Sequence, residues 1–237
     1  MSTTRADSAG VGHGAAELAA LLARMRRLRA AEVAAAGSGE PAAALPDPAV
    51  VTRQVAADAD LPALFIDAAR KAGTQVHDGR GGDWDAALAV VLQARGARQV
   101  VADYESLGSA ELAARVEAAL GAAGCTVTTS TADEVLFTVD AAVTGVQAAI
   151  AETGSLVWAA TAGAARGTTL IPPAHIALVR VGQILPDLCD FYGAALRPEA
   201  MPAHATLITG PSKTADIEGI IITGVHGPGT VDIVLVD

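Results

Sequence analysis

Helical and strand-like hydrophobic patterns alternate along the chain from Asp47 to about residue 135. Acidic residues beside prolines, or capping side chains, mark the helix starts, and glycines mark the ends. The patterns predict helices that start at Asp47-Pro48, run from Asp60-Leu-Pro62 to near Gly73, and cover 83–96 and 109–124. The apolar runs between them predict strands over Thr74–His77, Arg98–Ala102 and Cys125–Thr129. This alternation favours right-handed crossovers and a parallel sheet covered by helices on both faces.

After Val135 the apolar runs are separated by short polar turns instead of full helices. Strands are predicted over Val139–Thr144, Leu156–Ala160, Ile176–Val181, Ala205–Thr209 and Val231–Val236. One more helix is predicted over Ile184–Tyr192. Because α/β proteins bind ligands at turns beyond their strand ends, we expect the functional site in this half.

A separate amphipathic helix is predicted over Ala15–Ala36, where leucines and a methionine form one apolar stripe and arginines crowd the other faces. Small polar residues precede it, and a linker follows to about Pro46. We therefore expect an N-terminal helical arm over residues 1–45 and, over 46–237, an α/β domain with a doubly wound, mostly parallel sheet. Packing of the arm on its own domain, on a subunit mate or on a partner is compatible with the pattern.

Composition and charge exclude several classes of function. The chain is 51% hydrophobic and 18% charged, which is typical of a globular protein, and no apolar run reaches the roughly 20 residues of a membrane span. With no signal-peptide pattern, we expect a cytoplasmic protein. The net charge of −10 argues against nucleic acid as a partner. Cys125 and Cys189 are far apart and lack CxxC spacing, so we predict no zinc or iron–sulfur site in this chain.

The turn Gly210–Glu218 is the strongest candidate for chemistry. A short apolar run leads into Gly210-Pro211, and the polar residues that follow are Ser212, Lys213, Thr214, Asp216 and Glu218. If this turn opens a helix, its unpaired N–H groups, the helix dipole and the lysine suit an anion. The two hydroxyls would add donors, and the two carboxylates would hold the lysine, cap the helix or move protons. A helix cap with a solvated charge cluster explains the same residues without a ligand.

Two further polar turns lie in the same half. Glu152-Thr153-Gly154-Ser155 places a carboxylate beside two hydroxyls, with Glu152 as a base, nucleophile or ligand orienter. His175 follows Ile-Pro-Pro-Ala and His226 lies in Gly-Val-His-Gly-Pro, so both are predicted in proline-bounded turns. An ordinary β-turn and structural histidines are the alternative. No HxH or HExxH spacing occurs, so no metal site is predicted.

Taken in order, the segments Asp140–Val157, Leu170–Ile176, Thr209–Glu218 and Gly224–Pro228 resemble the LUD-domain family of the LutC lactate-utilisation type. The resemblance covers the chain from about Pro46 to its end. It implies a fold similar to the sugar-phosphate isomerase and CoA-transferase group, and a role in L-lactate oxidation beside iron–sulfur proteins. The motif positions that it carries over are Glu152, Thr153, Gly154, Ser155, His175, Gly210, Ser212, Lys213, Thr214, Asp216, Glu218 and His226.

The expected function is therefore a cluster-free accessory subunit of a system that oxidises lactate to pyruvate. It would bind a small anionic ligand in a pocket built from the three turns, with Glu152 or His226 handling protons. No cofactor is expected in this chain, and iron–sulfur clusters are expected in its partner subunits. A stand-alone acyl or formyl transferase, ligase or sugar-phosphate isomerase, or a non-catalytic scaffold, remains compatible with the sequence, as does a homo-oligomer.

Overall fold

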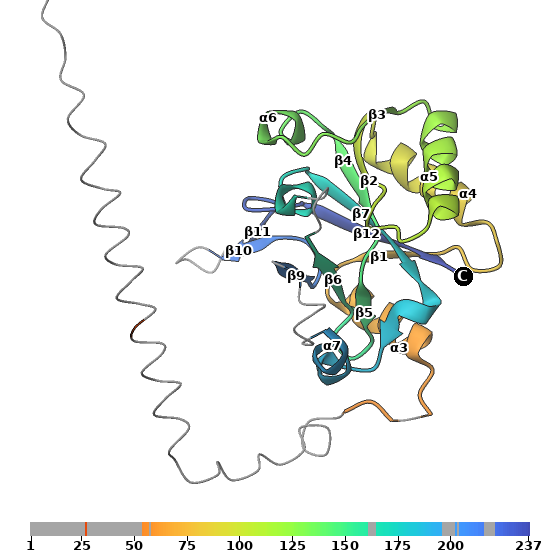
Figure 1. Cartoon of the computed structure of the whole chain (residues 1–237), viewed down its shortest axis with the longest axis vertical. Coiled ribbons are helices and arrows are strands. Elements are labelled where there is room, and N and C mark those ends of the chain that lie inside the picture. Colours follow the sequence, from red (N-terminus) through yellow and green to blue (C-terminus); the bar gives the residue numbers. More distant parts are fainter. Residues whose placement is uncertain are drawn as a thin grey trace, which may run out of the picture. The chain divides into compact units, whose positions relative to one another are not determined.

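The computed structural model describes Arg27 and residues 54–56, 58–160, 165–195, 202, 204–215 and 221–237. The helices predicted over Ala15–Ala36 and from Asp47-Pro48 lie outside these residues, except for Arg27. The chain divides after Val51 into two units, and every helix and strand with defined bounds belongs to the second, Thr52–Asp237 (Figure 1). No helix in the described ranges combines the length and the apolarity that crossing a membrane requires. The domain boundary at residue 46 stays a prediction.

Six parallel strands form the main sheet, in the order β1-β12-β7-β4-β2-β3. They are β1 (Gln75–Asp78), β2 (Gln99–Asp103), β3 (Thr126–Thr128), β4 (Ala141–Thr144), β7 (Ala174–Arg180) and β12 (Thr230–Val236). All six match strands predicted from the sequence to within a few residues. The predicted mostly parallel α/β architecture is confirmed.

Three helices begin and end where capping residues predict. They are α3 (Leu61–Lys71), α4 (Trp84–Arg95) and α5 (Ala110–Ala122). The Asp60 carboxylate accepts from the Ala63 amide at 3.1 Å, and the Ser109 hydroxyl accepts from the Leu112 amide at 3.1 Å. Gly96 ends α4 with a φ of 63°, a left-handed conformation that glycine adopts without steric cost.

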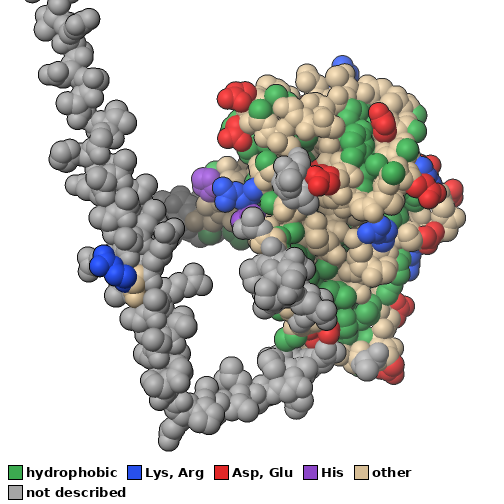
Figure 2. Space-filling view, in the orientation of Figure 1, with side chains coloured by type: hydrophobic (Ala, Val, Ile, Leu, Met, Phe, Trp, Pro, Cys, Tyr) green, Lys and Arg blue, Asp and Glu red, His purple; other side chains and the backbone are tan. Residues whose placement is uncertain are grey.

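The two faces of the main sheet are covered differently. On one face, Leu88 of α4 and Val116 of α5 pack against Ile176 and Val234 of the sheet. On the other, α3 and a second, four-stranded sheet form a separate apolar cluster, and the short helix α6 (Asp133–Leu136) packs beside β2 and β4. Acidic side chains are scattered over the face shown in Figure 2, with basic ones among them.

The second sheet has the strand order β8-β5-β6-β9 and was not predicted as a separate layer. Its strands are β5 (Ala148–Ile150), β6 (Ser155–Ala159), β8 (Ile184–Leu185) and β9 (Ala205–Ile208). The predicted helix over Ile184–Tyr192 is wrong at its start, because Ile184 and Leu185 pair with β5. Helix α7 (Leu188–Ala195) starts later, where the Asp187 carboxylate accepts from the Asp190 amide at 3.0 Å. Short 3-10 turns, η1 (Arg166–Thr169) and η2 (Val181–Gln183), flank β7.

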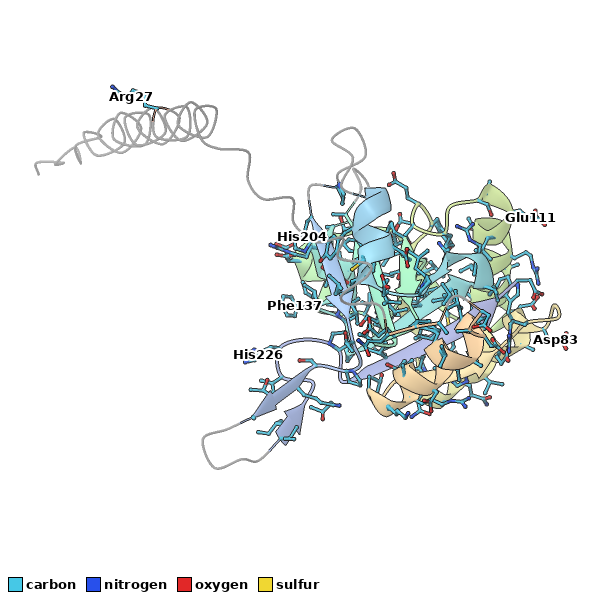
Figure 3. The ribbon with its side chains drawn as sticks, turned by 90° about the horizontal axis from the view of Figure 1, so that it is seen from below. Arg27, Asp83, Glu111, Phe137, His204 and His226 are labelled. Atoms are coloured by element: carbon cyan, nitrogen blue, oxygen red, sulfur yellow. The ribbon has the colours of Figure 1, made fainter. Side chains whose placement is uncertain are left out.

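A two-stranded antiparallel ribbon, β10 (Lys213–Ala215) and β11 (Ile221–Thr223), completes the described domain. The ribbon extends away from both sheets, as Figure 3 shows. It lies between β9 and β12 in the chain, where the sequence predicted a helix after Gly210. That prediction is wrong, because Lys213–Ala215 pairs with Ile221–Thr223 instead of coiling.

Candidate functional site

The three predicted turns meet at one place, which we call the turn cluster. Glu152–Gly154 joins β5 to β6, Gly210–Ser212 joins β9 to β10, and Gly224–Gly229 joins β11 to β12. The Ser212 amide donates to the Pro228 carbonyl, and the Gly224 amide donates to the Ser212 carbonyl, each at 2.9 Å. The second and third turns are therefore joined directly, and the first reaches the second through the hydroxyl of Ser155.

Two glycines of the turn cluster lie against the end of α3. A Cβ on Gly154 would stand 2.2 Å from the Ala69 amide nitrogen, and one on Gly210 would stand 2.3 Å from the Ala72 carbonyl oxygen. Both glycines also have positive φ, 67° and 78°. The motif glycines thus have a packing role that requires no ligand.

A chain of hydroxyls links the first two turns. Ser155 Oγ lies 2.7 Å from Thr153 Oγ1 and 2.7 Å from Thr209 Oγ1. Ser155 is buried, whereas Thr153 and Thr209 are exposed. These hydroxyls bond to one another across the junction of β6 and β9.

Lys213 is engaged within the protein. Its Nζ donates to the Ala72 carbonyl at 3.1 Å, where α3 ends and where carbonyl groups lack helical partners. The anion site proposed for Lys213 relied on a following helix, and that helix is absent because β10 follows instead. The remaining support for an anion at this position is the exposed lysine charge.

The candidate proton-handling residues lie on the surface. Glu152 and His226 are both exposed, and His226 lies on the outer side beside the ribbon (Figure 3). Thr214 is half-buried in β10. Asp216 and Glu218 lie outside the described residues. The roles assigned to these five residues stay predictions.

His175 does not lie in a turn, as the sequence predicted, but inside β7 in the centre of the main sheet. Its side chain is completely buried, and its Nε2 lies 2.9 Å from the Thr144 hydroxyl. Burial lowers the pKa of His175 to about 4, although the charge of Asp232 acts in the opposite direction. The imidazole is therefore neutral near pH 7 and is enclosed by the core.

The turn cluster lies at the amino edge of the main sheet. The Gly229 amide donates to the Pro173 carbonyl at 2.9 Å, just before β7 and β12 begin, and α3 ends just before β1 begins. Parallel α/β sheets bind ligands at the opposite, carboxyl edge. The turns therefore do not lie at the strand ends where a ligand pocket is expected in such a sheet.

Comparison with known proteins identifies the family. The model of the LUD domain matches residues 55–236. The chain belongs to the LUD domain family. The crystal structure of a DUF162 family protein from Deinococcus radiodurans shares the fold, with a TM-score of 0.52 and 23% identity over 77% of this chain and 100% of that one. The family recognised from four sequence motifs is confirmed.

Two relatives of this LUD domain chain carry the name lactate utilization protein C. The one from Macrococcus caseolyticus is 39% identical over 95 residues, which cover 37% of this chain and 40% of that protein. The one from Exiguobacterium sp. is 36% identical over 107 residues, covering 44% of this chain and 46% of that protein. The match thus spans less than half the length of these curated relatives.

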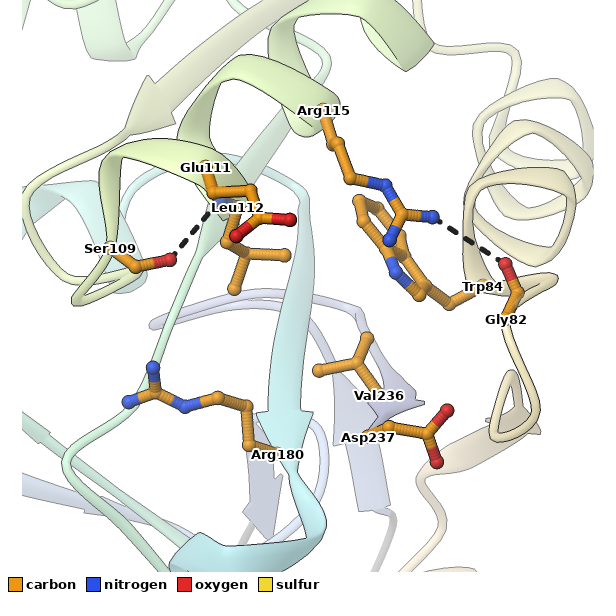
Figure 4. A pocket seen from close by; sticks show the side chains of 9 residues that line it. All are labelled: Gly82, Trp84, Ser109, Glu111, Leu112, Arg115, Arg180, Val236 and Asp237. Carbon is orange, nitrogen blue, oxygen red and sulfur yellow. Dashed lines mark hydrogen bonds between the residues drawn. The ribbon is translucent and has the colours of Figure 1, made fainter.

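The carboxyl edge of the LUD domain holds a cavity of about 210 Å³ that the sequence did not predict (Figure 4). The ends of β7 and β12, the glycine-rich turn before α4 and the first turn of α5 form its walls. We call it the carboxyl-edge cavity. Its lining residues are Gly82, Trp84, Ser109, Glu111, Leu112, Arg115, Arg180, Val236 and Asp237.

Two arginines bring positive charge to the carboxyl-edge cavity, and their partners differ. Arg115 stacks 4.4 Å from the centre of the Trp84 ring and lies 3.3 Å from the Asp85 carboxylate. The Arg180 guanidinium lies beside Gly108, 3.1 Å from where a Cβ would stand. Within the described part of the chain, no carboxylate forms an ion pair with Arg180. Its charge is available to a ligand.

Carboxylate groups, which accept hydrogen bonds, also line the carboxyl-edge cavity. Glu111 and Asp237 line the cavity, and Asp237 Oδ2 accepts from the Gly81 amide at 2.8 Å. The glycine-rich turn therefore already binds one carboxylate of the protein itself. Gly79–Gly82, directly after β1, is the sequence signal that could have indicated this edge, because glycine-rich turns between strand and helix often contact ligands.

Metal binding has no support among the residues described. They contain no cluster of three or more His, Cys, Asp or Glu side chains arranged to hold an ion. The buried carboxylate of Asp232 is engaged by Arg95 in two hydrogen bonds of 2.8 and 2.9 Å and by His77 at 3.1 Å. This group is a structural ion pair inside the sheet.

Proposed function

We propose that this chain is a subunit of a lactate-utilisation system and docks onto a partner through the ribbon β10–β11. Membership of the LUD domain family and the names of the two relatives support the system. The ribbon supports the docking, because it presents large apolar side chains to solvent. Consistent with the sequence resemblance, we propose that the partner carries iron–sulfur clusters and that this chain carries none.

The single observation that carries the docking proposal is the exposure of the two isoleucines of β11. Ile221 is 66% exposed and Ile222 is 51% exposed. Neighbouring residues of a strand point to opposite faces, so each face of β11 presents an isoleucine to solvent. Val225, 51% exposed just after β11, extends this apolar surface. Exposed apolar groups that cluster in this way are typical of interaction sites.

The turn cluster gives the ribbon a fixed base. Its links to the domain are the Ser212–Pro228 and Gly224–Ser212 hydrogen bonds and the bond from Lys213 to Ala72. A ribbon held at its base loses less conformational entropy on binding than a flexible one. The family motif at Gly210–Lys213 then serves to position a docking element.

The test is co-purification of the chain with iron–sulfur subunits expressed beside it. Ile222→Lys introduces a charge on the ribbon, and Val90→Lys is the matched control, since Val90 is 59% exposed on α4. Burial of one isoleucine contributes about 1.5–3 kcal/mol, so Ile222→Lys should weaken the complex about tenfold or more. Val90→Lys should leave it intact. Equal retention of the iron-containing subunits by both variants would refute docking through the ribbon.

A further inference from the structure

We propose that the carboxyl-edge cavity binds a short monocarboxylate that carries a hydroxyl group, the class to which 2-hydroxy acids belong. The inference deepens the proposed function and rests on it for the choice of lactate as the probe. The cavity itself supplies the argument, through its charges, its acceptors and its size.

The carboxylate subsite is the side of the cavity formed by Arg180 and Ser109. Arg180 has no ion-pair partner among the described residues, and its planar guanidinium matches a carboxylate in a two-point hydrogen bond. Ser109 Oγ accepts from the Leu112 amide, so its own O–H proton remains available for donation. Gly108, which precedes Ser109 and lies beside the Arg180 guanidinium, has a φ of 76° and no side chain, which lets the guanidinium approach the backbone.

The hydroxyl subsite is formed by the two carboxylates, Glu111 and Asp237. Carboxylates accept hydrogen bonds, so either one pairs with a ligand hydroxyl. They also repel a second negative charge in the same small space. The two carboxylates therefore disfavour dicarboxylates and phosphate, although the cavity also contains Arg180 and Arg115, which attract anions.

The size of the cavity indicates how large a group it can enclose. Sites for drug-sized molecules measure about 300–1,000 Å³. The carboxyl-edge cavity, at about 210 Å³, falls below that range. An acid of a few carbon atoms fits inside it, whereas a nucleotide or a CoA ester would extend beyond it into solvent.

Titration calorimetry on the full chain tests the proposal with L-lactate, malonate and phosphate as probes. L-Lactate should bind saturably and at least about tenfold more tightly than malonate or phosphate. Arg180→Gln should weaken L-lactate binding by at least about tenfold, because a charged hydrogen-bond donor is lost. Arg98→Gln is the matched control and should change nothing, since Arg98 is exposed just before β2, at the amino edge of the main sheet, and does not line the cavity.

The selectivity has its own test. The double variant Glu111→Gln and Asp237→Asn removes both negative charges and keeps the shapes, so malonate binding should improve at least about threefold. Unchanged L-lactate binding in Arg180→Gln, malonate binding equal to that of L-lactate, or no saturable L-lactate binding by the wild type would each overturn the proposal. Thermal unfolding of each variant verifies its folding. Ile222 lies at the other edge of the sheet, so Ile222→Lys tests docking without touching the cavity. Loss of the partner with intact L-lactate binding would show that the two sites work independently, so that a failure of one proposal can be told from a failure of the other.

Discussion

Replacing Gly154 by alanine measures how closely the turn cluster is packed onto α3. The new Cβ would stand 2.2 Å from the Ala69 amide nitrogen, a distance that atoms in proteins do not reach, so the backbone of the turn or of α3 has to move. The position also has a φ of 67°. The substitution therefore combines two costs, an unfavourable backbone conformation and an overpacked contact.

The two costs can be separated with two other glycines. Gly96 has nearly the same φ, 63°, but open space around its Cβ position, and Gly182 has open space and no positive φ. Alanine in a left-handed conformation costs about 1–2 kcal/mol, and overpacking costs about 1–3 kcal/mol more. We expect Gly182→Ala to be neutral or slightly stabilising, Gly96→Ala to lose about 1–2 kcal/mol, and Gly154→Ala to lose about 2–5 kcal/mol.

Urea unfolding followed by circular dichroism gives the three free energies on one scale. For a domain of this size, each kcal/mol corresponds to about 2–4 °C in Tm, so thermal melts provide an independent check. A loss for Gly154→Ala no larger than that for Gly96→Ala would refute the packing explanation. The glycine in the family motif would then need a different reason, such as a ligand that contacts its backbone.

Three further substitutions test buried and surface charges by urea unfolding. Because the pKa of His175 is lowered to about 4 from 6.5, only the unfolded chain gains its proton as the pH falls through this window. The free energy of unfolding should therefore decrease by about 2 kcal/mol between pH 7 and 5. His175→Asn should remove that decrease. If the variant keeps the pH profile of the wild type, His175 is not the group responsible. Asp232→Asn should cost about 1–3 kcal/mol, since the two-point pairing with Arg95 is lost, and a neutral result would show that the pair contributes nothing. Lys213→Met should cost less than about 1 kcal/mol, because only the hydrogen bond to Ala72 is lost. If the turn cluster binds an anion, calorimetry with phosphate will detect binding in the wild type and none in this variant.

The local signals in the sequence predicted most of the fold. Ser109 caps α5 and Gly96 ends α4, as their positions indicated, because capping depends on a few neighbouring backbone groups. The strands of the main sheet were recognised by their apolar runs. The helix expected after Gly210 failed, since pairing between Lys213–Ala215 and Ile221–Thr223 depends on residues beyond the local window.

The site was predictable only in part, for a physical reason. Hydroxyls and glycines in three turns indicated that those turns belong together, and they do meet. Their position at the amino edge of the main sheet, however, depends on which strand of the sheet each turn precedes, and this is a property of the whole fold. The carboxyl-edge cavity depends on Arg180 and Ser109 converging from the ends of β7 and the start of α5. The spacing of these two residues along the chain gives no sign that they lie at the same cavity.

The seven residues of β12 separate the turn cluster from the carboxyl-edge cavity, which corresponds to roughly 20 Å along the strand. A partner that contacts only the ribbon would therefore leave the cavity mouth uncovered. Small molecules would enter and leave while the complex stays assembled, so turnover of a ligand would not require the subunits to dissociate. Any communication between the two ends would have to pass through the strands and helices that connect the two edges.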